Sequence, residues 1–147
     1  MNDARAKKAL SDYLISEGYN THPETENYLF DLKATKDNKE ELFEVEVKNQ
    51  WGKTWNPTWV EIRIPGRKQR LIDLWKKDFP YLKFTFVILN TTIDQGWFIP
   101  ADVVDESRVG TIQNSKRIGE PHLKEPFFHI PVERAELKTL QNMKESS

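Results

Sequence analysis

The sequence predicts a single mixed α/β domain built around a mixed β-sheet, and three observations lead to this prediction. Apolar residues recur with helical spacing over 3–17 and 67–79, whereas 28–34, 41–49 and 83–89 have the alternating or continuously apolar character of strands. Two of these strands are separated by a short polar turn, which favours an antiparallel hairpin. A helix lies between two later strands, which favours a crossover connection, so the sheet should contain both strand directions.

The bulk composition is that of one ordinary globular domain. The chain has 147 residues, of which 37% are hydrophobic and 12% aromatic, which is enough for a core and excludes wholesale disorder. The net charge of −1 neither favours nor excludes a nucleic-acid partner, so the distribution of charge has to decide. We expect one domain over residues 1–147, with a core at 3–99 and a C-terminal extension at 100–147.

The absence of cysteine excludes a disulfide framework and a thiolate metal site, and it favours an intracellular protein. No apolar run is long enough for a signal peptide or a membrane span. We therefore expect a cytoplasmic protein of the cell that makes it or, if a phage encodes the chain, of its host.

The chain is expected to begin with a helix over residues 3–17. Leu10 and Leu14 lie one helical turn apart, and Gly18 is typical of a helix end. A short first strand follows at 19–23.

Three further strands are predicted before the next helix. Those at 28–34 and 41–49 are joined by the polar turn 35–40, and that at 59–64 ends where Pro65-Gly66 breaks the alternation.

The second half begins with an amphipathic helix over 67–79, in which Leu71 and Trp75 share one face. The stretch 83–89 is the most apolar strand and should be central, so that 59–89 would form a strand–helix–strand crossover.

Shorter elements are expected near the C-terminus. A strand is predicted at 95–99 and a short helix at 101–106. Pro131 suits the first position of a final helix that runs towards Met143.

An alternating segment near the middle of the chain carries the candidate chemistry. Residues 43–50 read FEVEVKNQ, in which apolar residues alternate with two glutamates and a lysine. Asp31 lies on the polar side of the neighbouring strand, so it should face Glu46 and Lys48 if the apolar sides of both strands share one core. Glu46 and Lys48 would be about 7 Å apart along their strand, and neighbouring strands lie roughly 5 Å apart. Two carboxylates so placed can share a hard divalent cation, and an adjacent ammonium can position a water molecule or neutralise charge on a phosphate.

The order of these residues and elements resembles the PD-(D/E)XK nuclease superfamily. An aspartate on one strand, Asp31, is followed after 14 residues by Glu46-Val47-Lys48 near the end of the next strand. The elements around them fit the αβββαβ core of that family's restriction-endonuclease-like fold, and the resemblance covers residues 3–90. Phe30 stands where the family often has proline.

The resemblance implies metal-dependent cleavage of DNA by a small nuclease of the Holliday-junction-resolvase type. Asp31 and Glu46 would hold Mg²⁺ or Mn²⁺, the carbonyl of Val47 would be a further ligand, and Lys48 would support the attacking water. The compact size, with no obvious target-recognition domain, favours a structure-selective endonuclease, and cutting two strands favours a homodimer. Glu44 is expected to be an accessory acid or an ion-pair partner. The alternative for these charges is a solvent-facing strand that protects a sheet edge.

The segment 50–59 contains three of the five tryptophans and follows the candidate lysine directly. One interpretation is a flexible flap that meets nucleic acid, with Lys53 on a phosphate and Trp51 or Trp55 stacked on a base or sugar. The other is that these indoles close the edge of a core or a protein interface. We assign Trp59 to the core.

Residues 63–79 carry six basic side chains and two aspartates within a nearly neutral chain. Several of the cations gather at the start of the predicted helix, where the helix dipole disfavours them, so a phosphate partner would explain their position. A solvated helix face is the alternative. The expected nucleic-acid contacts here are Arg63, Arg67, Lys68, Gln69 and Arg70.

Two other functions are compatible with the sequence. One is a catalytically idle nuclease fold that binds nucleic acid or protein, and the other is an interaction protein whose tryptophans form an interface. The intact set of Asp31, Glu46 and Lys48 argues against the first. DNA binding that weakens with salt would argue against the second.

Overall fold

The computed structural model describes residues 4–22, 30–112 and 125–140. In these ranges none of the helices is long and apolar enough to cross a membrane. The elements in chain order are α1 (Ala4–Ser16), β1 (Asn20–His22), β2 (Leu32–Lys36), β3 (Lys39–Val47), β4 (Glu61–Pro65), the 3-10 helix η2 (Gly66–Lys68), α2 (Gln69–Asp78), β5 (Lys83–Leu89), β6 (Gln95–Pro100), α3 (Ala101–Glu106), β7 (Arg108–Ile112), β8 (Glu125–Pro131), the 3-10 helix η4 (Val132–Arg134) and β9 (Glu136–Thr139).

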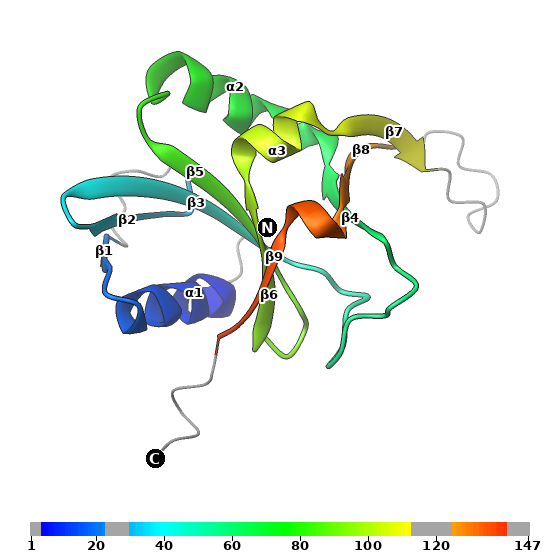
Figure 1. The fold of residues 1–147 in the computed structure, drawn as a ribbon, viewed down its shortest axis with the longest axis horizontal. Coiled ribbons are helices and arrows are strands. Elements are labelled where there is room, and N and C mark those ends of the chain that lie inside the picture. The colour runs from blue at the N-terminus through cyan, green and yellow to red at the C-terminus, as the bar shows by residue number, and fades with distance from the viewer. Residues whose placement is uncertain (1–3, 23–29, 113–124, 141–147) are drawn as a thin grey trace.

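The strands form two sheets, and helices lie on both sides of the larger one (Figure 1). The larger sheet has the order β1-β2-β3-β5-β6-β9, and the smaller has the order β4-β8-β7. Helix α1 covers one face of the larger sheet, whereas α2, α3 and the smaller sheet lie on the other. The predicted fold class, mixed α/β with a mixed central sheet flanked by helices, is confirmed.

Strands β2 and β3 form the predicted antiparallel hairpin. Its turn contains only Asp37 and Asn38, because Lys36 already pairs with Lys39. Both turn residues have positive φ, 54° and 66°, which suits the tight turns that match the twist of a hairpin. The predicted turn at 35–40 was therefore too long. Strand β3 then pairs in parallel with β5, and this pairing makes the sheet mixed.

The predicted crossover at 59–89 is wrong in one respect, because β4 does not join the sheet that contains β5. Strand β4 pairs antiparallel with β8 in the smaller sheet. The crossover instead connects β3 to β5 and passes through β4, η2 and α2. Alternation at 59–64 identifies a strand with one buried face, but it does not say which sheet the strand joins.

The predicted final helix from Pro131 towards Met143 is wrong over the described residues. Pro131 ends β8, and only the three residues of η4 are helical before β9 begins. Strand β9 pairs antiparallel with β6 at the edge of the larger sheet, so tertiary pairing decides its conformation. Met143 lies outside the described residues. Strands β7 and β8 were not predicted. They pair with each other within the expected extension, and β8 and β9 pair with β4 and β6 of the expected core.

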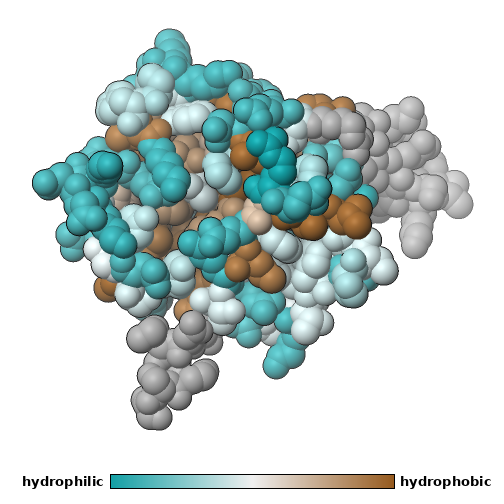
Figure 2. Space-filling model, viewed as in Figure 1, coloured by the Kyte–Doolittle hydropathy of each residue, from teal (hydrophilic) through white to brown (hydrophobic). Residues whose placement is uncertain are grey.

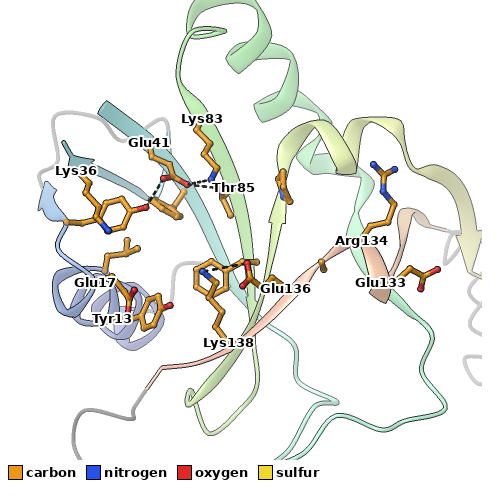
Figure 3. A pocket seen from close by; sticks show the side chains of 16 residues that line it. Tyr13, Glu17, Lys36, Glu41, Lys83, Thr85, Glu133, Arg134, Glu136 and Lys138 are labelled. Carbon is orange, nitrogen blue, oxygen red and sulfur yellow. Dashed lines mark hydrogen bonds and ion pairs between the residues drawn. The ribbon is translucent and has the colours of Figure 1, made fainter. Parts of the chain in front are cut away.

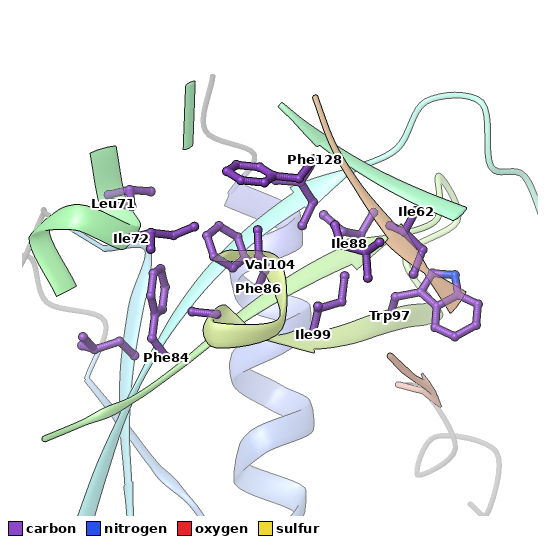
Figure 4. Close-up of a cluster of buried hydrophobic side chains, with 14 of the residues drawn as sticks. Ile62, Leu71, Ile72, Phe84, Phe86, Ile88, Trp97, Ile99, Val104 and Phe128 are labelled. Atoms are coloured by element: carbon purple, nitrogen blue, oxygen red, sulfur yellow. The ribbon is translucent and has the colours of Figure 1, made fainter. Parts of the chain in front are cut away.

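Each face of the larger sheet has its own hydrophobic cluster. On the α1 face, Leu10 and Leu14 pack with Phe43 and Val87. The opposite cluster joins the larger sheet to α2, α3 and the smaller sheet (Figure 4); its members include Ile62, Leu71, Ile72, Phe84, Phe86, Ile88, Ile99, Val104, Phe128 and Ile130. Full burial of each such side chain contributes about 1.5–3 kcal/mol, so this second cluster holds the two sheets together.

The two apolar residues that flank Asp31 pack on different faces of the sheet. Phe30 belongs to the α2 cluster, where its ring lies 4.9 Å from that of Phe84 in an edge-to-face contact. Leu32 belongs to the α1 cluster. The condition that the apolar sides of both strands share one core is therefore not met at Phe30, which lies in a bend before β2 begins.

Candidate active site

The candidate acids lie near the end of β3, at the rim of the cluster between the two sheets. Because side chains alternate along a strand, Glu44 and Glu46 lie on the same face of β3 as Leu42, which packs in that cluster. Phe43 and Val45 lie on the other face and pack against α1. Exposure of the carboxylate side chains rises along the strand, from 10% for Glu44 to 31% for Glu46. Glu46 is therefore the more accessible of the two to a ligand from solvent.

Asp31 lies just before the start of β2 and binds the edge of β3. Strand β2 begins at Leu32, which pairs with Phe43, so the Val45 amide has no strand partner on that side. Val45 N–H donates instead to Asp31 Oδ2 at 3.0 Å. The other carboxylate oxygen lies 3.6 Å from Lys7 Nζ on α1. Asp31 is thus fixed by the chain itself, with its charge directed at the strand that carries the glutamates.

Glu44 is the most buried of the three acids, and both Lys68 and Asp31 act on its charge. Lys68 Nζ donates to Glu44 Oε2 at 2.8 Å, which confirms the expectation of an ion-pair partner. Burial raises the pKa of Glu44, and the negative charge of Asp31 raises it further, while Lys68 and a hydrogen bond from the Asp31 backbone oppose this shift. The two carboxylates therefore repel each other, and Lys68 offsets part of that repulsion.

Glu46 faces the cations of η2. Lys68 Nζ lies 3.8 Å from Glu46 Oε1, and Arg67 Nη2 lies 3.8 Å from Glu46 Oε2. The position of η2 depends on Gly66, because a Cβ there would lie 3.0 Å from the Pro126 carbonyl oxygen of β8. The smaller sheet therefore holds two cations over the carboxylates of the larger one.

Lys48 follows the glutamates on the same side of the strand and meets the tryptophan segment. Its Nζ lies 5.4 Å from the centre of the Trp59 ring, within the range of a cation–π contact. Burial lowers the pKa of Lys48, and the nearby charge of Arg63 lowers it further. Both effects increase the fraction of neutral amine, the form that can accept a proton from water.

The tryptophan segment is a packed cluster rather than a flexible flap. Trp51 is 0% exposed, so its ring is not available to stack on a base, and this interpretation of Trp51 was wrong. Trp55 is partly buried and makes edge-to-face contacts with Trp51, Trp59 and Trp97 at 5.1–5.4 Å. The backbone is also fixed, because Thr91 N–H donates to the Trp51 carbonyl. The assignment of Trp59 to the core is confirmed in part, since it packs at the cluster's edge.

The other basic and polar candidates are exposed or engaged with groups other than the three acids. Arg63 is exposed on β4 and acts on Lys48, whereas Arg70 is exposed on the first turn of α2. Gln69 donates to Asp73 within the same helix at 2.9 Å, so in this conformation its amide is engaged away from the carboxylates. Lys53 is exposed, and its charge acts on Asp94 in the turn before β6.

Asp31, Glu44 and Glu46 carry oxygen ligands of the kind that a hard divalent cation takes, but in this structure cations of the chain pair with them. Among the residues that the structure describes, no group of three or more histidine, aspartate or glutamate side chains is spaced to hold a metal ion. Magnesium, however, usually takes only one or two carboxylates and completes its shell with water and substrate phosphate. Asp31 and the two glutamates carry such oxygens, and a cation would relieve the repulsion between Asp31 and Glu44.

A pocket of about 520 Å³ opens on the opposite face of the larger sheet, beside α1 (Figure 3). In the space-filling view, pale and brown surface near the centre is framed by hydrophilic groups (Figure 2). The pocket contains Glu41, which accepts hydrogen bonds from Tyr19 at 3.2 Å and Thr85 at 3.0 Å. Its charged lining is balanced, with Lys36, Lys83, Arg134 and Lys138 against Glu17, Glu41, Glu133 and Glu136. This balance does not favour a polyanion, unlike the cation-rich side of β3.

Sequence reasoning missed the parts of the site that depend on tertiary structure. Lys7 contacts Asp31 from α1. Asp12 pairs with Lys8, and Glu17 lines the pocket beside α1. Lys7 follows the buried Ala6, so it lies beside the apolar stripe that faces the sheet. This position was the signal in the sequence that Lys7 could reach the sheet.

Comparison with known proteins finds a likeness among solved structures. Neither a protein-family model nor a curated protein matches the chain. Among solved structures, it is similar to Hjc, a Holliday junction resolvase from the hyperthermophilic archaeon Archaeoglobus fulgidus, with a TM-score of 0.49 and 10% sequence identity. The match covers 84% of this chain and 86% of that one.

Proposed function

We propose that the protein is a metal-dependent endonuclease that hydrolyses phosphodiester bonds in DNA. The observation that carries this proposal is that three kinds of group lie along β3, directly after it and on the facing η2. Asp31, Glu44 and Glu46 supply carboxylate oxygens, Lys48 supplies a partly buried amine of lowered pKa, and η2 supplies cations. Metal-assisted hydrolysis of a phosphodiester uses groups of these kinds.

Each group has a distinct part in the proposed reaction. Asp31 and Glu46 would hold Mg²⁺ or Mn²⁺ with help from the Val47 carbonyl, and the metal would lower the pKa of a bound water and polarise the phosphate. Lys48 would orient that water and accept its proton, a role that its lowered pKa favours.

The exposed cations on the same side of β3 support DNA as the substrate. Arg63 and Arg67 are exposed, and the side chain of Arg67 lies against Glu46. Such cations neutralise backbone phosphates without reading sequence. We therefore extend the proposal to a structure-selective enzyme, acting on branched or duplex DNA as a homodimer, since two cuts require two sites.

The test is cleavage of supercoiled plasmid and of a four-way DNA junction with Mg²⁺ or Mn²⁺. We expect Glu46→Gln and Lys48→Met each to lower the cleavage rate at least about a hundredfold, the usual effect of losing a group that handles the proton or the charge. Matched controls on the same strand are Glu40→Gln and Lys39→Met, whose side chains are exposed at its far end. These should cut at the wild-type rate.

The same assay distinguishes the alternatives. A folded wild type that binds DNA in a salt-dependent way but cuts none with either metal is an idle binding module. If it neither cuts nor binds, the interaction-protein alternative gains support. Glu44→Gln decides which glutamate serves with Asp31, because the larger loss of rate identifies the metal-holding carboxylate.

A further inference from the structure

We infer that Lys68 is a displaceable internal cation, which neutralises Glu44 and Glu46 when no metal is bound and turns to a substrate phosphate when a divalent cation takes its place. This inference rests on the proposed function, and it assigns Lys68 a role that exposed arginines nearby cannot have. It concerns the side chain alone, because η2 itself is fixed against β8 by the close approach of Gly66 to Pro126.

The geometry places the ammonium where a metal would compete with it. The Lys68 side chain is only 14% exposed, and its Nζ lies 2.8 Å from Glu44 Oε2 and 3.8 Å from Glu46 Oε1. One cation therefore bridges two carboxylates. A divalent ion on either glutamate would approach this ammonium closely, and two cations at such a separation repel strongly in a partly buried site.

Lys68 is the neighbour best suited to move. Its four-carbon stem can swing a compact ammonium while the backbone stays in place, whereas the planar guanidinium of an arginine is held by its geometry. Arg67 is already 64% exposed and lies no closer than 3.8 Å to Glu46, so it blocks the carboxylate less. An ammonium released from the glutamates would keep its charge and would face the side where the phosphate has to lie.

The first test measures metal binding without DNA, by titrating the protein with Mn²⁺ in a calorimeter. We expect Lys68→Met to bind Mn²⁺ about tenfold more tightly than the wild type, because a competing cation has been removed. The control Arg67→Met should stay within about twofold. Lys77→Met, an exposed cation on α2, should match the wild type.

Because Lys68→Met leaves Glu44 buried without its partner, a second pair of variants guards against misfolding. Glu44→Gln/Lys68→Met removes both members of the ion pair, and it should bind Mn²⁺ more tightly than Glu44→Gln alone. Equal or weaker binding in both comparisons would overturn the inference. Absence of Mn²⁺ binding by every variant would instead refute the proposed function, and this inference with it.

The second test measures DNA affinity by fluorescence anisotropy in a Lys48→Met background, which removes cleavage. Adding Lys68→Met should weaken DNA binding several-fold with Mn²⁺ present and leave it unchanged without metal, since only the released ammonium reaches a phosphate. An equal loss under both conditions would show that Lys68 contacts DNA permanently, and no loss under either would show that it does not contact DNA. Either result overturns the displacement.

Discussion

Single residues of one type have different roles here because their surroundings differ. Glu44 and Glu46 alternate along one strand, yet Glu44 is nearly buried beside Lys68 while Glu46 is one-third exposed. The alternation of FEVEVKNQ and the sequence spacing from Asp31 led to the choice of Glu46 and Lys48, whose roles stay a prediction. These local patterns could not identify Lys68 as the cation that bridges the two glutamates. Its helix, η2, is placed beside β3 by the pairing of β4 with β8, which is a tertiary contact.

Tyr19 gives a residue-scale prediction about alkaline stability. Burial raises its pKa to about 12, with a further contribution from the charge and hydrogen bond of Glu41. An unfolded tyrosine titrates near pH 10, so between about pH 10 and about pH 12 the unfolded chain loses a proton that the native protein keeps. The free energy of unfolding should therefore fall with pH across this interval.

The measurement is urea unfolding across that interval for the wild type, Tyr19→Phe and Tyr81→Phe. Tyr19→Phe should show a shallower decline than the wild type, whatever its stability at neutral pH. Tyr81 is 77% exposed, so its variant should follow the wild type. A decline that is equally steep in Tyr19→Phe would show that the Tyr19 hydroxyl is not responsible.

Elements were predictable where local pattern decides their conformation. Strand β5 and helix α3 have the predicted starts, and the amphipathic pattern at 67–79 identified α2. Strand β9 could not be predicted, because its pattern is weak and its conformation depends on Gly96 and Trp97 across the sheet edge. The short 3-10 helix after Pro131 is the part of the predicted helix that is present.

The β5–β6 hairpin gives an element-scale prediction. A Cβ on Gly96 would lie 2.7 Å from Leu89 Cδ2, and Leu89 is completely buried. Gly96→Ala should therefore lower the free energy of unfolding by about 1–3 kcal/mol through overpacking. Gly52→Ala is the matched control, because nothing lies within 4 Å of its added Cβ. Denaturant unfolding measures both, and equal stabilities would contradict the packing argument.

At the scale of the whole molecule, the smaller sheet is joined to the larger one by a shared cluster. Ile62 and Ile130, on its paired strands, are 0% exposed and pack with Phe86 and Ile88 of the larger sheet. These residues are visibly apolar in the sequence, but composition cannot tell whether the two sheets share one core or each has its own. A shared core implies that the sheets unfold together.

Ile130→Ala tests this coupling. We expect a loss of about 2–5 kcal/mol in the free energy of unfolding, the usual cost of a cavity at a buried isoleucine. Tryptophan fluorescence and far-UV circular dichroism should give one coincident transition in both proteins. Val109→Ala on exposed β7 should change stability by less than about 0.5 kcal/mol. Two separate transitions in the wild type would show that the sheets are independent.

The pairing of β4 with β8 also has a kinetic consequence. His129 bonds to Glu61 across these strands, 68 positions earlier in the chain, whereas the β2–β3 hairpin closes through a two-residue turn. Loops of such different length should close at very different rates, with the hairpin early and the smaller sheet late. Since η2 packs on β8, the acids of β3 would take up their positions before Lys68, the cation that bridges them, takes up its own. Refolding would then assemble the carboxylates first and complete their charge balance only in its last step.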